Sequence, residues 1–205
     1  FFKPFRVDDN IIIKPSWEQL DDVRENDLVI ELDPGTAFGT GTHETTKLCI
    51  SAIKKFINKD TVLLDAGSGS GILSIIARKL GAKRVLGIDI DPVATSTAME
   101  NAEINGLDLN DGSLSFMTGN IIEDNGIRSG IGRETYDIVV ANILADVIIP
   151  LSAVIGENIK PGGIFISSGI IDSKEEAVKK ALQDNGFVIL EINRMGEWVS
   201  FVAKK

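Results

Sequence analysis

Three glycines at alternate positions follow an acidic residue in the first half of the chain. The run LLDAGSGSGIL places Asp65 at the end of an apolar segment, then Gly67, Gly69 and Gly71, then apolar residues at helical spacing. This order predicts a strand, a tight turn and the start of a helix, and glycines in such a turn let a ligand approach the backbone. Ile72 stands where a dinucleotide fingerprint has its third glycine, so the turn favours a nucleoside over a pyrophosphate.

A second acidic residue ends the next predicted strand. Asp89 lies 22 residues after Gly67, close to the spacing of about 20 residues at which an acid accepts hydrogen bonds from ribose hydroxyls. A carboxylate suits a diol because it offers only acceptors. Asp91 directly precedes Pro92 and fits the alternative role of helix N-cap better. We therefore predict that Asp89 binds ribose.

Two asparagines follow later predicted strands. Asn120 comes shortly after the third strand, where the edge of an adenine would lie, and Asn142 ends the fourth, facing the same crevice from the other side. The amide oxygen of Asn142 is able to accept a hydrogen bond from an amine. The alternative for Asn142 is a plain helix N-cap.

The segment PGTAFGTGTHETT, residues 34–46, contains three glycines and five threonines around Phe38. A helical pattern follows over 47–57, with Thr42 as a candidate N-cap, so this loop favours an anionic group at a helix start. His43 is the sole histidine, a candidate base, although a capping or packing role is more common at a helix start. Cys49 falls within the helix, and we expect a buried structural thiol there.

Strands and helices alternate along the rest of the chain, which predicts right-handed crossovers and a mostly parallel sheet. Residues 119–135 form a polar connection, and Pro150 is expected to start or kink the main run of the long helix. The predicted strands are 61–64, 84–88, 113–117, 136–141 and 164–168 with a closing pair at 187–192 and 198–203, and the helices are 72–80, 93–105, 142–159 and 172–185.

Charge and hydropathy restrict the partners. The net charge of −9 opposes binding to nucleic-acid phosphates, and no apolar run is long enough to cross a membrane. Residues 1–35 hold nine acidic and four basic residues, which indicates either a solvated acidic surface or a docking face for a basic partner. We expect a cytoplasmic, monomeric protein without a metal site, direct nucleic-acid contact or membrane contact.

The glycine turn resembles the first motif of the class I methyltransferases that use S-adenosylmethionine. Together with residues 34–46, the run GIDIDP at 87–92 and the run NILA at 142–145, it resembles the bacterial methyltransferases of ribosomal protein L-eleven over nearly the whole chain. The resemblance implies a doubly wound α/β fold, Rossmann-like, with a mostly parallel seven-stranded sheet and one antiparallel strand near the C-terminus. It implies S-adenosylmethionine as cofactor and S-adenosylhomocysteine as product.

The resemblance also implies roles for individual residues. By resemblance, four residues are expected to bind the cofactor: Thr46, Gly67, Asp89 and Asn142. We expect five further residues to contribute to the same site: Asp65, Gly69, Gly71, Ile90 and Asn120. Asn142 is also the expected catalytic residue, with Phe38, Ile143 and Leu144 as an apolar slot in which a lysine loses its proton more easily.

The expected substrates are lysine side-chain and/or N-terminal amino groups of ribosomal protein L-eleven. Ile143, Leu144 and Ala145 provide no ring on which a flipped base would stack, which favours a protein amine over a nucleobase. By resemblance, residues 34–205 form the catalytic domain and residues 1–33 a linker with short strands after an N-terminal recognition domain. We expect the chain alone to bind cofactor yet methylate poorly.

Three alternatives remain open from the sequence. The first is a methyltransferase for another protein lysine or a small-molecule amine. The second is a cofactor-binding module without turnover. The third is a nicotinamide oxidoreductase, which Ile72 in place of the third glycine disfavours.

Overall fold

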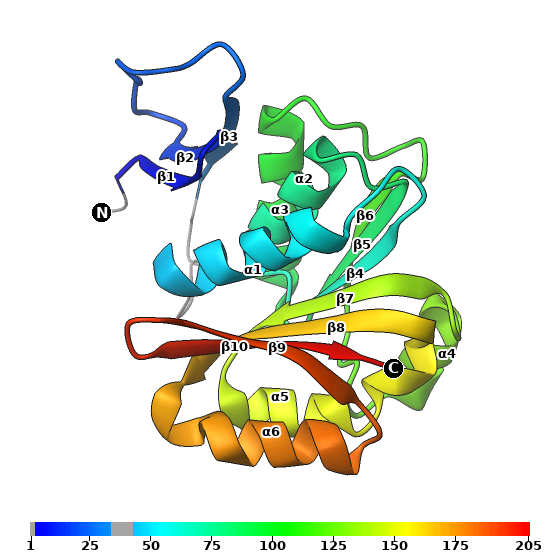
Figure 1. Ribbon diagram of the computed structural model, residues 1–205. Coiled ribbons are helices and arrows are strands. Elements are labelled where there is room, and N and C mark those ends of the chain that lie inside the picture. Colours follow the sequence, from blue (N-terminus) through cyan, green and yellow to red (C-terminus); the bar gives the residue numbers. More distant parts are fainter. Residues whose placement is uncertain (1–2, 34–42) are drawn as a thin grey trace.

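The computed structural model describes residues 3–33 and 43–205, which form two β-sheets and the helices packed on them (Figure 1). The larger sheet has seven strands in the order β6-β5-β4-β7-β8-β10-β9. Its strands are β4 (Val62–Ala66), β5 (Arg84–Asp89), β6 (Leu114–Thr118), β7 (Tyr136–Asn142), β8 (Ile159–Ile171), β9 (Val188–Met195) and β10 (Trp198–Lys204).

Every neighbouring pair in this sheet is parallel except those that include β10, which runs antiparallel to both β8 and β9. The prediction of a mostly parallel seven-stranded sheet with one antiparallel strand is confirmed. The chain builds outward from β4 to β5 and β6, then crosses to β7 on the other side of β4. The strand order therefore reverses between β4 and β7, where ligands bind in open α/β sheets.

Helices cover both faces of the large sheet (Figure 1). One face carries α1 (His43–Phe56), α2 (Ile72–Lys79) and α3 (Pro92–Ile104), and the other carries α4 (Asn125–Ile131), α5 (Ala145–Ser152) and α6 (Glu175–Asp184). Neighbouring residues on a central strand enter different cores: Leu63 packs with the α1 side and Leu64 with the α5 side. This two-sided burial explains why the central strands are continuous apolar runs.

Some predicted boundaries were wrong. Residues 119–135 include α4, because the Asp124 side chain accepts hydrogen bonds from the backbone N–H groups of Gly126 and Ile127 and caps it. The helix predicted over 142–159 is only α5 followed by a 3-10 turn at Ile155–Asn158. Asn142 belongs to β7 because it still pairs with Ser168 of β8.

Two further elements begin earlier than predicted. Helix α1 starts at His43, four residues before the periodic run at 47–57 and directly after the predicted N-cap Thr42, which lies outside the described residues. Strand β8 starts at Ile159 instead of the predicted residue 164. Since Tyr136 pairs with Ile159 and Ile138 with Ile164, the intervening residues of β8 bulge out of the ladder instead of preceding the strand.

The N-terminal residues form a separate three-stranded sheet of β1 (Phe5–Asp8), β2 (Ile11–Pro15) and β3 (Leu28–Leu32). β1 pairs antiparallel and β3 parallel with β2. The guanidinium of Arg6 donates two hydrogen bonds to the Asp27 carboxylate, at 2.7 and 2.9 Å. These bonds, with one from the Arg24 N–H, lower the pKa of Asp27 to about 2. The pair ties the end of the connection between β2 and β3 back to β1.

Two asparagine side chains hold β3 against the main domain. Asn101 lies in α3, and Asn105 is the C-terminal cap of that helix. Asn105 accepts a hydrogen bond from the N–H of Glu31 at 2.9 Å and donates one to its carbonyl at 2.7 Å. Asn101 does the same for Asp33 at 2.8 and 2.9 Å, and also donates to the carbonyl of Ser70 at 2.9 Å. Side-chain amides thus replace a neighbouring strand along β3, and Asn101 links this sheet to the glycine turn.

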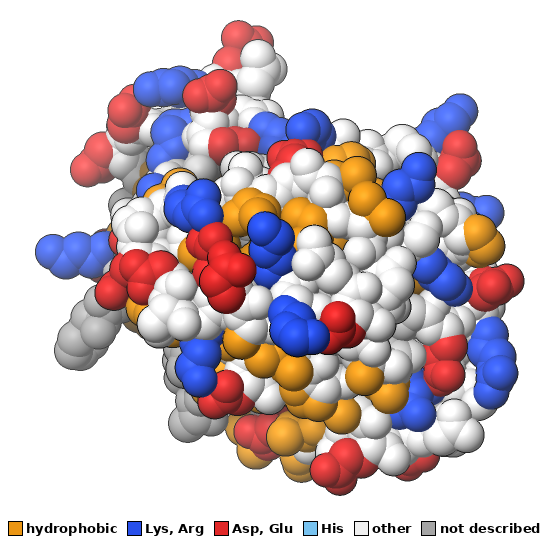
Figure 2. All heavy atoms as spheres, turned by 60° about the horizontal axis from the view of Figure 1, so that its bottom comes forward, with side chains coloured by type: hydrophobic (Ala, Val, Ile, Leu, Met, Phe, Trp, Pro, Cys, Tyr) orange, Lys and Arg blue, Asp and Glu red, His pale blue; other side chains and the backbone are white. Residues whose placement is uncertain are grey.

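Charges on the surface are mixed in sign. With the side that carries α6 turned toward the viewer, Lys and Arg side chains lie among Asp, Glu and hydrophobic ones (Figure 2). Four acidic residues of the connection between β2 and β3 are exposed, namely Glu18, Asp21, Asp22 and Glu25. Within the described residues, no helix is long and apolar enough to cross a membrane.

Replacement of Asn101 by leucine tests the link between the two sheets. The change removes three hydrogen bonds and leaves the carbonyl of the buried Ser70 without this donor, so we expect the free energy of unfolding to fall by about 2 kcal/mol. Urea unfolding measures the loss. Asn110→Leu, in an exposed loop, is the control, and equal losses in the two variants would contradict the assigned role.

Candidate functional site

The glycine turn lies against the end of β5. The N–H groups of Gly67 and Ser68 both donate to the carbonyl of Ile88, at 2.8 and 3.0 Å. Gly67 has φ +82°, a left-handed conformation that side chains disfavour. A Cβ there would also lie 2.7 Å from Cγ2 of Ile143. Backbone conformation and space therefore both require glycine, and the turn stays open toward the cavity.

Asp89 is held in place by the same turn. Its Oδ2 accepts a hydrogen bond from the N–H of Gly69 at 2.9 Å, and its Oδ1 accepts one from the N–H of Asp91 at 3.0 Å. Each carboxylate oxygen has a second lone pair, so the group retains acceptor capacity toward a ligand. The Asp91 side chain accepts from the N–H of Val93 and caps α3, which confirms the predicted cap.

Asp65 lies behind the turn and is 1% exposed. Its Oδ2 accepts a hydrogen bond from the hydroxyl of Ser74 at 2.7 Å, while Oδ1 is buried without a partner among the described residues. Burial raises the pKa of this carboxyl to about 7, and the hydrogen bonds from Ser74 offset only part of the effect. Asp65 supports the turn from the protein interior and does not line the cavity.

The two strand-end asparagines differ in what they leave free. The Oδ1 of Asn142 is buried and has no hydrogen-bond partner in the described part of the chain. The Oδ1 of Asn120 accepts from the N–H groups of Ile122 and Glu123, both at 3.1 Å. Asn142 therefore offers an unused acceptor, whereas the Asn120 oxygen already caps its own loop.

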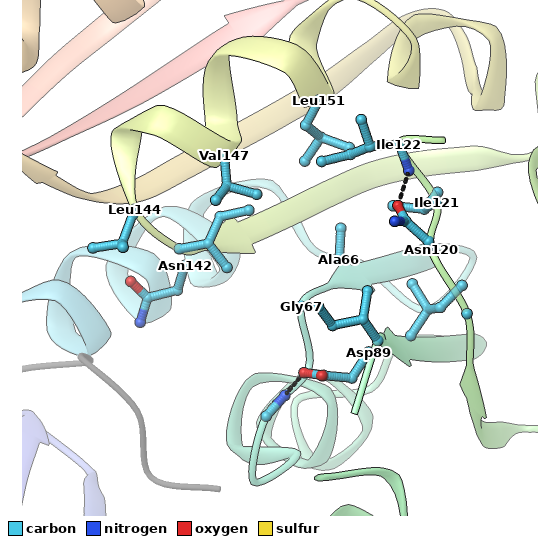
Figure 3. A pocket seen from close by; sticks show the side chains of 15 residues that line it. Ala66, Gly67, Asp89, Asn120, Ile121, Ile122, Asn142, Leu144, Val147 and Leu151 are labelled. Atoms are coloured by element: carbon cyan, nitrogen blue, oxygen red, sulfur yellow. Dashed lines mark hydrogen bonds between the residues drawn. The ribbon is translucent and has the colours of Figure 1, made fainter. Parts of the chain in front are cut away.

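A cavity of about 340 Å³ opens at the carboxyl ends of β4, β5, β6 and β7, at the point where strand order reverses (Figure 3). Asn142 and Leu144 lie at one end, Asn120, Ile121 and Ile122 at the other, and Asp89 between them. Among the described residues, the lining is formed by Ala66, Gly67, Gly69, Ile88, Asp89, Ile90, Gly119, Asn120, Ile121, Ile122, Asn142, Ile143, Leu144, Val147 and Leu151, and of these only Asp89 has an ionisable side chain.

The structure brings most of the predicted site residues to this cavity. Lining it are Gly67, Gly69, Asp89, Ile90, Asn120, Asn142, Ile143 and Leu144. Gly71 caps α2 and, like Asp65, lies behind the lining. Thr46 is buried in the first turn of α1 and is not a lining residue, and Phe38 lies outside the described residues.

Sequence reasoning missed seven lining residues: Ala66, Ile88, Gly119, Ile121, Ile122, Val147 and Leu151. Ala66 and Ile88 could have been found, because each lies at the end of a predicted strand. Val147 and Leu151 lie three and seven residues beyond Leu144, on one face of α5. Ile121 and Ile122 carried no usable signal, since residues 119–135 were predicted to be a polar connection.

Two reactive residue types lie apart from the cavity. The ring of His43 stacks on that of Phe5, with centroids 3.8 Å apart and an angle of 11° between the planes. Cys49 is fully buried, which confirms the structural thiol, and burial raises its pKa to about 12. Over residues 3–33 and 43–205, no group of three or more His, Cys, Asp or Glu side chains is placed to hold a metal ion.

Comparison with known proteins identifies the family. The sequence matches the family described as ribosomal protein L11 methyltransferase (PrmA) over residues 1–205. The chain belongs to this family. It is 59% identical over 216 residues to the ribosomal protein L11 methyltransferase of Lachnoclostridium phytofermentans and 49% identical over 208 residues to that of Agathobacter rectalis. All of the chain is covered, but only 65% and 64% of these relatives, so the chain spans just under two thirds of their length.

Solved structures agree with this assignment. The crystal structure of ribosomal protein L11 methylase from Lactobacillus delbrueckii subsp. bulgaricus has a TM-score of 0.87 and 32% identity, covering 98% of each chain. A SAM-dependent methyltransferase from Aquifex aeolicus has a TM-score of 0.65 and 15% identity, covering 84% of this chain and 98% of that one. The second likeness concerns the fold alone.

The buried Asp65 predicts a pH effect on stability. The unfolded carboxyl ionises near pH 4 and the folded one only near pH 7, so the folded state holds a proton that the unfolded state releases in between. This residue's contribution to stability should fall as pH rises from about 4 to about 7 and stay constant above.

Asp65→Asn cannot ionise, so its stability relative to wild type should be higher at pH 8 than at pH 5. Urea unfolding of both proteins at the two pH values measures this difference. Asp60→Asn, at an exposed position, is the control and should show no such change. If the stability difference between Asp65→Asn and wild type did not change with pH, the raised pKa assigned to Asp65 would be wrong.

Proposed function

We propose that the protein is an S-adenosylmethionine-dependent protein N-methyltransferase that acts on lysine side-chain and/or N-terminal amino groups of ribosomal protein L11. The observation that carries the proposal is the buried Oδ1 of Asn142, which has no hydrogen-bond partner within residues 3–33 and 43–205 and belongs to the same cavity as Asp89. An acceptor for an amine and an acceptor for a ribose diol thus belong to one cavity. Family membership supports the substrate, since the relatives are named for this ribosomal protein.

The residues present fit the cofactor. Asp89 retains acceptor capacity for the ribose hydroxyls, and the turn at Gly67 and Gly69 leaves space for the amino-acid end of the ligand. Ile121 and Ile122 provide an apolar surface for the base. When bound, S-adenosylmethionine supplies an electrophilic methyl group on a sulfonium and leaves as S-adenosylhomocysteine.

The protein's own contribution is to bind and orient the amine. The Oδ1 of Asn142 accepts an N–H of the substrate and so directs the nitrogen lone pair into the cavity. Alignment of this kind can account for up to about 7 to 11 kcal/mol of barrier lowering. Asp89 is bound to two backbone N–H groups and is not needed as a base.

The proton of the amine is lost before transfer. Ile143, Leu144 and Val147 surround the approach to Asn142 with apolar groups, and such surroundings disfavour the ammonium form of a lysine. The ammonium releases its proton to bulk water as it enters the slot, and the neutral amine takes up the methyl group without a dedicated base. The sequence predicts that Phe38 belongs to the same slot. This remains a proposal, because Phe38 lies outside the described residues.

Substrate recognition is assigned to a different part of the full-length protein. We propose that residues 34–205 form the catalytic domain and residues 1–33 connect it to a preceding domain that binds ribosomal protein L11. A net charge of −9 and the lack of an aromatic ring at residues 143–145 support a protein substrate over a nucleic acid.

We also propose that the protein acts in the cytoplasm and as a monomer.

Asp89→Asn tests cofactor binding. Loss of the charged acceptor should weaken binding of S-adenosylhomocysteine by about 10- to 100-fold, because hydrogen bonds to charged groups contribute about 1.5 to 3 kcal/mol. Isothermal titration calorimetry measures the dissociation constant. Asp91→Asn, which alters an exposed acid two residues away, is the matched control. An unchanged affinity of Asp89→Asn would count against the role of Asp89 in binding ribose. If wild type did not bind S-adenosylhomocysteine at all, the assigned cofactor would be wrong.

Asn142→Ala tests the amine-binding role. We expect kcat of the full-length protein to fall by about 100-fold, since the amine loses its orienting acceptor. Transfer of a labelled methyl group to ribosomal protein L11 measures the rate, and mass spectrometry identifies the modified amines. Asn193→Ala, on the edge strand β9, is the control. Turnover by Asn142→Ala at the wild-type rate would make the catalytic assignment wrong.

A further inference from the structure

The nucleoside end of the cavity is formed by a short loop instead of a regular element. Residues Gly119 to Ile122 follow β6 and precede α4, and all four line the cavity. Ile121 is 7% exposed, and its backbone lies outside the hydrogen-bond ladder of the sheet. Backbone carbonyls in such a loop need hydrogen-bond donors from elsewhere. The position of this wall therefore depends on groups behind it.

Arg128 of α4 supplies those donors. Its Nη1 donates to the carbonyl of Ile121 at 2.9 Å and to the carbonyl of Ile122 at 2.7 Å. Its Nε donates to Oε1 of Glu157 at 2.8 Å. The arginine is 9% exposed and is not a lining residue. Since the guanidinium is planar with donors in fixed directions, it sets both carbonyls relative to α4 and to the 3-10 turn that carries Glu157.

Two other contacts also fix the loop. The Asn120 Oδ1 accepts from the N–H groups of Ile122 and Glu123. A Cβ on Gly119 would lie 2.5 Å from Cδ1 of Ile127, so the loop packs directly on α4. The loop is thus held by hydrogen bonds from its own N–H groups to Asn120 and by hydrogen bonds from Arg128 to its carbonyls.

We propose that Arg128 is a positioning residue for cofactor binding: it holds the Ile121–Ile122 wall in the place that the base of the nucleoside occupies. This inference rests on the proposed function, because it assigns the wall to the base of S-adenosylmethionine. Arg128 acts only through the two carbonyls, so it sets the affinity for the nucleoside and not the orientation of the amine at Asn142, at the other end of the cavity (Figure 3).

Calorimetry with two ligands tests the proposal. S-adenosylhomocysteine carries the nucleoside and the amino-acid arm, whereas 5′-methylthioadenosine carries the nucleoside without that arm. The variants are Arg128→Met, which removes all donors, and Arg128→Lys, which keeps a charged donor but not the planar fork. Titrations are made well below the unfolding midpoint of every variant, determined by circular dichroism.

Asn158→Ala is the matched control. The Asn158 side chain donates to the carbonyls of Arg128 and Gly132, both at 2.8 Å, so its loss weakens the same region without touching the wall. We expect Asn158→Ala to lower the unfolding midpoint yet keep both affinities within about twofold of wild type.

We expect Arg128→Met to weaken both ligands by a similar factor of about 10 or more, and Arg128→Lys to recover part of the loss. A loss in Arg128→Met no larger than in Asn158→Ala would overturn the proposal, as would a loss confined to S-adenosylhomocysteine. Failure of wild type to bind either ligand would instead refute the proposed function, so the two failures are distinguishable.

Discussion

The hydrogen bonds that join the glycine turn to the end of β5 are the interaction on which the rest of the site depends. Two N–H groups of the turn bond to the carbonyl of Ile88, and a third bonds to the carboxylate of Asp89. These contacts hold the turn close to the sheet and keep Asp89 pointed at the cavity. They are possible because β4 and β5 are parallel neighbours, so their carboxyl ends meet at one edge.

Burial next to the turn disfavours the charged form of the Asp65 carboxyl. Asp65 is enclosed with one hydroxyl donor, so the folded protein favours its protonated form up to about pH 7. Asp89, at the end of the neighbouring strand, is only partly buried, receives two N–H donors and lines the cavity. Two similar side chains on adjacent strands therefore have different roles: one supports the turn from inside and the other faces the ligand.

The elements around the cavity are positioned by side chains that do not line it. Asn101 connects Asp33, the residue that follows β3, to Ser70 of the turn, and Arg128 connects α4 to the carbonyls of Ile121 and Ile122. Both side chains are largely buried, and their donors bond to backbone carbonyls. Irregular loops need such partners because they lack a ladder of their own. Where regular structure ends at the site, polar side chains thus supply the hydrogen bonds to the backbone.

The sequence by itself determined the alternation of strands and helices, the parallel sheet and the strand-end positions of Asp89 and Asn142. These features are encoded locally: apolar runs, glycine stops and acids at strand ends express propensity and burial within a few residues. Tertiary structure alone decided that Ile121 and Ile122 face the cavity, that Arg128 lies behind them, and that Asp65 is buried while Asp89 is not. These outcomes depend on contacts between residues distant in sequence, such as Arg128 with Glu157 or Gly67 with Ile143, and no local pattern records them.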